Sequence, residues 1–263
     1  MITRHEELSI NKWLKIAQID GDAEATREEK SLAITAVLCG KDVDELLNLP
    51  YTEVAELTTK AGFILEKPKL PKVRKEYRVG GYTLIPTRKA HELTTAQFIH
   101  FEEYAKKYRA DGLKWLPHLL STHLVPKGKV YNTDYDVTEV IEAIGDDMCY
   151  LDAQALLAFF FETTEAVIAK FPNLFGGGNL YDSSEEQATE GGEVGENQGA
   201  MESDSFAQRW GWTSCVRRVA EISFSNMFHI YTIPALEFLT LLCFANDYAN
   251  HEKENLERWR RAH

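Results

Sequence analysis

The stretch LTTAQFIHFEEYAKKYRADG, residues 93–112, shows how this chain builds its helices. Thr94 can accept a hydrogen bond from the backbone of Gln97, and the Gln97 side chain can bond back to Thr94, which forms a capping box at a helix start. Gly112 follows Asp111 and predicts the end of the helix. Between these two signals, apolar side chains recur at helical spacing, at Phe98, Phe101, Ala105 and Tyr108.

The chain beyond this helix is also rich in apolar residues. Residues 113–125 predict a helix that Pro117 starts or kinks. A helix beginning near Asp136 and a long apolar helix from Asp147 to Pro172 complete the region. We expect these helices to belong to one body.

The chain before it predicts a second group of helices and a hairpin. Residues 8–66 indicate a compact helical unit, in which Ser9 is a suitable N-cap and Gly40 stands where a glycine ends a helix. Residues 67–75 are basic and contain two prolines, which favours an extended connector. Residues 77–85 have two glycines in their middle, which predicts a two-stranded β-hairpin.

Residues 182–204 form an acidic segment without lysine, arginine or aromatic side chains. Such a segment cannot bury enough apolar surface to offset the entropy lost on ordering, so we expect a disordered linker. It supplies eight of the twelve excess negative charges of the chain. Its acidic residues are Asp182, Glu185, Glu186, Glu190, Glu193, Glu196, Glu202 and Asp204.

The sequence therefore predicts a mainly α protein, with a bundle-like helical body, one small β-hairpin, a flexible acidic linker and a C-terminal helical module. The last module contains a helix from Ser205 to Ser223 and a long helix from Pro234 to Trp259. The four predicted segments are an N-terminal helical unit at 1–66, a hairpin and helical body packed with it at 67–181, the linker at 182–204, and the C-terminal module at 205–263.

Composition narrows the class of function. The 263 residues are 44% hydrophobic and 27% charged, which suits one or two globular domains. A net charge of −12 argues against a nucleic-acid surface, because phosphates are neutralised by clustered lysine and arginine. No apolar run reaches the roughly 20 residues of a membrane span, and the first residues predict no secretory signal. We expect a cytoplasmic protein without membrane contact.

Motifs that carry chemistry are absent from the sequence. His118 and His123 are five residues apart and have no third ligand at helical spacing, and no phosphate loop or nucleophile elbow occurs. We expect no catalytic residue, no metal and no cofactor. The alternative is an enzyme site assembled from distant residues, such as His118, His123 and Asp134. The cysteines form no close pair and are expected to be reduced, at Cys39, Cys149, Cys215 and Cys243.

Aromatic residues are the candidates for binding a partner protein. Phe159, Phe160 and Phe161 cannot all face one core on a helix, because consecutive side chains point about 100° apart. Either this helix is buried on most sides, which we favour, or one ring is exposed for a partner. Trp210 and Trp212 follow the acidic segment, and they either pack in the C-terminal module or line a partner groove.

Three stretches together resemble a known family. Residues 33–50 read AITAVLCGKDVDELLNLP, which gives a helix, a glycine, a short acidic helix and a Leu-Pro pair. Residues 93–99 begin an acidic and aromatic helix, and a tryptophan-bearing helix at Trp212 precedes the long helix from Pro234. This arrangement resembles the tail assembly chaperones of tailed bacteriophages.

The resemblance implies a non-enzymatic protein that acts in the host cytoplasm. Such chaperones shield the hydrophobic helices of the tape measure protein and help to recruit tail tube subunits, and they are absent from the mature virion. It therefore implies the tape measure protein and the tail tube protein as partners, with self-association possible. The alternative is a structural virion component, such as a connector or head–tail joining protein, which would have the same helical layout.

Overall fold

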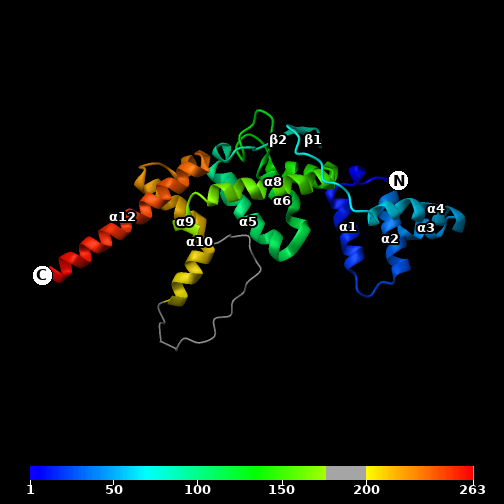
Figure 1. The fold of residues 1–263 in the computed structure, drawn as a ribbon, viewed down its shortest axis with the longest axis horizontal. Helices are drawn as coiled ribbons and strands as arrows, with labels where there is room; N and C mark the ends of the chain where they lie inside the picture. The colour runs from blue at the N-terminus through cyan, green and yellow to red at the C-terminus, as the bar shows by residue number, and fades with distance from the viewer. Residues whose placement is uncertain (176–199, 263) are drawn as a thin grey trace. The chain divides into compact units, whose positions relative to one another are not determined.

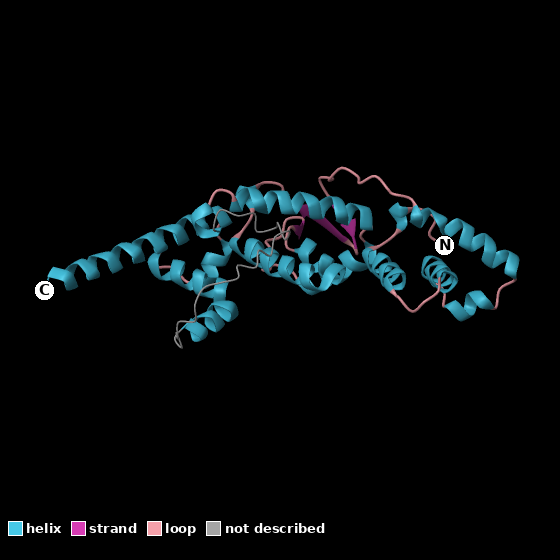
Figure 2. Cartoon of the chain, turned by 60° about the horizontal axis from the view of Figure 1, so that its bottom comes forward, coloured by secondary structure: helices cyan, strands magenta, loops and turns pink. Residues whose placement is uncertain are grey.

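The computed structural model describes residues 1–175 and 200–262, with side chains placed for 1–175 and 211–262. Helices make up most of this part of the chain, and strands form one small sheet (Figure 1, Figure 2). This confirms the predicted mainly α fold. Residues 182–199 of the predicted linker lie outside the described residues. At 200–204 the chain is already helical, since α10 begins before the predicted start at Ser205 (α10, Ala200–Ile222).

The chain divides into two compact units. Unit 1 comprises Met1–Thr87 and His100–Phe161, and unit 2 comprises Arg88–Ile99 and Glu162–His263. The predicted segments divide the chain differently, because they group Arg88–Ile99 and residues 162–181 with the body. Both stretches belong to unit 2 because their apolar side chains are buried in the same hydrophobic core as the C-terminal helices.

Unit 1 begins with a group of short helices. Ser9 caps the helix Ile10–Gly21 by accepting a hydrogen bond from the backbone N–H of Lys12 at 3.4 Å. Gly40, with φ of 66°, ends the helix Arg27–Cys39. Both predicted caps are confirmed. The elements are η1 (His5–Glu7), α1 (Ile10–Gly21), α2 (Arg27–Cys39), α3 (Val43–Leu47), α4 (Tyr51–Ala61) and η2 (Gly62–Leu65).

The sheet of unit 1 contains the predicted hairpin and one further strand. β1 (Tyr77–Val79) pairs with β2 (Tyr82–Pro86), and the Gly80-Gly81 turn has positive φ at both residues, as a tight hairpin turn requires. β3 (Leu124–Pro126) pairs antiparallel with the other edge of β2. The predicted helix at 113–125 is therefore wrong at its end, because a residue before proline favours extended backbone and β2 offers open hydrogen-bonding groups.

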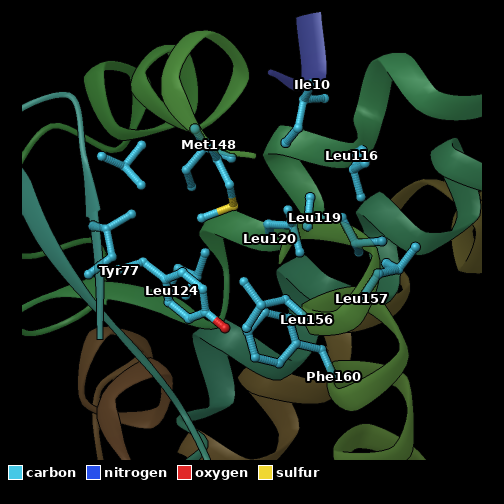
Figure 3. Packing of buried hydrophobic residues seen from close by; sticks show 14 of the residues in the cluster. Ile10, Tyr77, Leu116, Leu119, Leu120, Leu124, Met148, Leu156, Leu157 and Phe160 are labelled. Carbon is cyan, nitrogen blue, oxygen red and sulfur yellow. The ribbon is translucent and has the colours of Figure 1, made fainter. Parts of the chain in front are cut away.

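The remaining helices of unit 1 enclose its core. Leu119, Leu120, Leu124, Leu156 and Phe160 converge with Met148 in one buried cluster (Figure 3). These helices are α5 (Thr95–Asp111), η4 (Gly112–Trp115), α6 (Leu116–Ser121), α7 (Val137–Asp147) and α8 (Tyr150–Ile168), of which α5 begins and α8 ends in unit 2.

Unit 2 joins the start of α5 to the C-terminal helices. The predicted capping box is confirmed: the Thr94 N–H donates to Gln97 Oε1 at 3.0 Å, and the Gln97 N–H donates to Thr94 Oγ1 at 3.3 Å. Backbone bonds then tie Thr95 to Ile233 at 2.9 Å and Ala235 to Leu93 at 2.8 Å. Its other elements are η3 (Ala90–Glu92), α9 (Pro172–Phe175), α10, α11 (Met227–Thr232) and α12 (Ala235–Ala262).

Candidate functional site

The three consecutive phenylalanines on α8 pack against the core of unit 1. Phe160 is fully buried, and Phe159 and Phe161 are half-buried against the same cluster. The Phe161 ring lies 5.3 Å from the ring of Phe101, edge to face. The favoured interpretation, burial on most sides of this helix, agrees with this packing.

Both predicted tryptophans, Trp210 and Trp212, lie on α10. The side chain of Trp210 lies outside the described residues. Trp212 is half-buried in unit 2, where its ring lies 5.5 Å from Phe98, 6.3 Å from Phe238 and 6.4 Å from Phe175. Trp212 therefore holds together segments of unit 2 that are far apart in the sequence.

Trp212 also lines a cavity of about 340 Å³, which we call the Trp212 cavity. Among the residues that line it, Arg218 Nη1 donates a hydrogen bond to Asn246 Oδ1 at 2.6 Å, which holds the guanidinium in place. Burial raises the pKa of the Cys215 thiol, an effect that the nearby Arg218 charge opposes. The thiol is therefore protonated at neutral pH and is a weak nucleophile. The lining residues are Leu174, Phe175, Trp212, Ser214, Cys215, Arg218, Leu242 and Asn246.

The last helix, α12, continues beyond the core of unit 2. Its first half buries Phe238, Leu242 and Ala245 against the unit, whereas every residue from 247 to 262 is exposed. In Figure 1 the red end of α12 runs clear of the other helices of its unit. This half of α12 is therefore open to another protein.

The exposed half of α12 repeats the spacing of the buried half. Alternating steps of four and three residues connect the buried Phe238, Leu242 and Ala245. The same steps continue along the exposed half of the helix, and we call the residues at these exposed positions the distal seam. Leu256 is 48% exposed and Trp259 is 60% exposed. Spacing of this kind lines one face of a helix for packing against another helix. The distal seam consists of Ala249, Glu252, Leu256 and Trp259.

Unit 1 has a second cavity, of about 250 Å³, with mixed charges. The guanidinium of Arg74 contacts both carboxylate oxygens of Asp152, at 3.1 and 2.8 Å. Burial raises the pKa of Asp152. The neighbouring Arg74 charge lowers it by a smaller amount, so the pKa stays above its usual value. Lys69 and Arg78 also line this cavity, opposed by two further acidic residues, so its charges do not select a ligand of one sign.

The residues of the alternative enzyme site have separate surroundings. His123 is fully buried, with its ring 4.7 Å from both Phe101 and Phe160. His118 lies 4.8 Å from the Trp115 ring, and Asp134 accepts a hydrogen bond from the backbone of Val130 at 3.1 Å. Among the described residues, no group of three or more histidine, cysteine, aspartate or glutamate side chains is placed to hold a metal ion.

The sequence alone does not identify the distal seam as a binding surface. Its heptad spacing is present in the sequence, but only the structure shows where the burial of α12 ends. The sequence also does not distinguish Phe224 and Phe228, which are 98% and 87% exposed, from buried phenylalanines. No spacing signal distinguishes an exposed phenylalanine from a buried one in so short a segment.

Comparison with protein-family models, with curated proteins and with solved structures gave no match for this chain. Within the described residues, no helix combines the length and the apolar character needed to cross a membrane. Function is therefore inferred from the residues and surfaces of the chain itself.

Proposed function

We propose that this protein is a non-enzymatic assembly chaperone of a phage tail, which shields hydrophobic helices of the tape measure protein in the host cytoplasm. The resemblance of its sequence motifs to that family suggests the class. The distal seam is the observation that carries the proposal, because three of its four residues, Ala249, Leu256 and Trp259, are apolar and stand at coiled-coil spacing on an exposed helix, with Glu252 as the one charged member.

The chemistry of the distal seam suits an amphipathic helix as its partner. Leu256 and Trp259 can cover an apolar stripe that would otherwise associate with other exposed stripes. Lys253 and Arg260 occupy the same flanking position in successive heptads, beside the seam. They favour a partner helix that carries acidic residues next to its own apolar stripe.

The described cavities are consistent with binding rather than bond-making. The Trp212 cavity offers mostly apolar side chains, one guanidinium and a protonated thiol. The unit 1 cavity centres on an ion pair between Arg74 and Asp152. Binding through the seam is reversible, since a single helix face buries a limited area, and a chaperone must release its client when the tail tube closes around it.

Co-expression with the tape measure protein tests this proposal. We expect the soluble fraction of the tape measure protein to rise when this chain is present and to stay low when it is omitted. An unchanged soluble fraction would contradict the proposal. Mass spectrometry of purified virions then separates a chaperone from a structural component, because a connector or joining protein is present in every particle and a chaperone is not.

A further inference from the structure

The Trp212 cavity combines apolar walls with a single charged group. Leu174 and Phe175 of α9, Trp212 of α10 and Leu242 of α12 supply its apolar and aromatic surface. Its volume of about 340 Å³ lies at the lower end of the range of about 300–1,000 Å³ that is typical of small-molecule sites. Among the described residues that line the cavity, Arg218 is the one charged side chain. Such a lining favours a ligand with an apolar body and one negative charge.

The guanidinium of Arg218 is positioned by its neighbour but not neutralised by it. Its Nη1 atom donates to Asn246 Oδ1 at 2.6 Å, and an amide oxygen is a neutral acceptor. This bond uses one N–H donor at one end of the guanidinium. The Nε and Nη2 donors together form the edge with which arginine binds a carboxylate through two parallel hydrogen bonds. Arg218 can therefore hold Asn246 and a ligand carboxylate at the same time.

Ser214 places a second donor beside Arg218. The two residues are four positions apart on α10, so their side chains are neighbours on one face of the helix, and both line the cavity. A carboxylate bound by Arg218 can accept a further hydrogen bond from the Ser214 hydroxyl. The chain as a whole has a net charge of −12, so the preference for an anion is local to this lining.

We propose that the Trp212 cavity binds a small free carboxylic acid. The aromatic or branched aliphatic body of the ligand lies between Trp212, Phe175 and Leu242. Its carboxylate bonds to Arg218 and Ser214. The ligand contacts α9, α10 and α12 together, so its binding stabilises unit 2 by mass action. No residue of the distal seam lines this cavity, so the proposal does not depend on the client.

Isothermal titration calorimetry of the full-length chain with hydrocinnamate, a phenyl ring joined to a carboxylate by two methylene groups, tests the site. We expect saturable binding with a dissociation constant of about 1 mM or lower. Arg218→Gln should weaken this binding at least about fivefold, because hydrogen bonds to a charged group are lost. Neutral hydrocinnamamide should bind the wild type and Arg218→Gln with the same, weaker affinity.

Arg217→Gln is the matched control. It removes the same charge from the neighbouring position on α10, where the side chain is 73% exposed and does not line the cavity. It should leave the affinity for hydrocinnamate unchanged, and circular dichroism should show the same helix content for both variants. Absence of saturable binding to the wild type, or equal affinities of the two arginine variants, would overturn the proposal.

Protection of Cys215 from a maleimide reagent locates the ligand. One full-length variant keeps Cys215 as its only cysteine, and a second keeps only Cys243, which is also half-buried but lies outside the cavity lining. Hydrocinnamate at about ten times its dissociation constant should slow labelling of Cys215 at least about fivefold and leave labelling of Cys243 unchanged. Equal labelling with and without hydrocinnamate at Cys215, or equal slowing at both cysteines, would contradict binding in this cavity.

A peptide probe separates a free acid from the C-terminus of another polypeptide. The tripeptide glycyl-glycyl-phenylalanine carries a phenyl ring and a carboxylate at a chain end, as such a terminus does. We expect it to bind more weakly than hydrocinnamate, because a cavity of about 340 Å³ encloses a small acid but not the attached chain. Tighter binding of the tripeptide would overturn the assignment to a free acid.

Discussion

The indole ring of Trp212 packs edge to face against the phenyl ring of Phe98, with 5.5 Å between the ring centroids. Phe98 lies in the first turn of α5 and Trp212 lies on α10, so this contact joins segments that are more than a hundred residues apart. It explains why Arg88–Ile99 belongs to the C-terminal unit rather than to the body that surrounds the rest of α5.

Removing the Trp212 ring should therefore destabilise unit 2. We expect Trp212→Ala to lower the free energy of unfolding by about 2–4 kcal/mol, since a large aromatic side chain is lost from a cluster of rings. Urea unfolding followed by circular dichroism measures the change. Arg217→Ala on the same helix is the control, because its side chain is 73% exposed, and it should change stability by at most about 0.5 kcal/mol. Equal effects would show that the ring cluster does not support the unit.

The hairpin turn offers a matched pair of glycine substitutions. Gly80 and Gly81 both have positive φ, but a Cβ at Gly80 would collide with the Ala143 side chain, whereas a Cβ at Gly81 meets open space. Gly81→Ala should lower the free energy of unfolding by about 1 kcal/mol through backbone strain alone. Gly80→Ala should lower it by at least about 2 kcal/mol, because a steric clash is added. Thermal unfolding of the two variants tests the contact between the hairpin and α7.

Acid should destabilise unit 1 through His123. Burial lowers the pKa of this side chain from 6.5 to about 3, so it stays neutral in the folded state while the unfolded chain binds a proton below pH 6.5. The free energy of unfolding should therefore fall as the pH drops from 6.5 towards 3, by up to about 1.4 kcal/mol per pH unit from this group.

His123→Leu isolates this contribution. The substitution removes the titrating group from a site where His123 Nε2 has no hydrogen-bond partner among the described residues. Urea unfolding between pH 4 and pH 7 should show a shallower loss of stability for the variant than for the wild type. Parallel pH profiles would contradict the assignment, because the other histidines and the carboxylates are the same in both proteins.

The sequence predicted features that neighbouring residues determine. The capping box of Thr94 and Gln97, the Ser9 cap and the left-handed Gly40 all depend on residues a few positions apart, and each is present in the structure. The Gly80-Gly81 turn is a further case, because its geometry requires glycine at both positions.

Features that depend on distant residues were not predicted. β3 forms because β2 has an open edge, which a helical pattern at 113–125 does not reveal. The partners of Trp212 come from α5, α9 and α12, so no local pattern identifies the cavity beside it. The exposure of Phe224 depends on how the turn after α10 is held. In each case the decisive partner is supplied by the tertiary fold.

The distal seam can be tested by a single charged substitution. Leu256→Asp places a carboxylate in the centre of the seam, on a part of α12 where every residue is exposed, so the core of unit 2 should be unaffected. Asn250→Asp adds the same charge to the opposite face of the helix and is the matched control. Circular dichroism should show the same helix content for both variants.

The most direct measurement is the soluble fraction of the tape measure protein when it is co-expressed with the wild-type chain, with Leu256→Asp and with Asn250→Asp. We expect the wild type and Asn250→Asp to keep the tape measure protein soluble, and Leu256→Asp to reduce its soluble fraction at least about fivefold, because a buried carboxylate without a partner weakens helix packing. Equal solubility with all three proteins would contradict a role for the distal seam in shielding client helices.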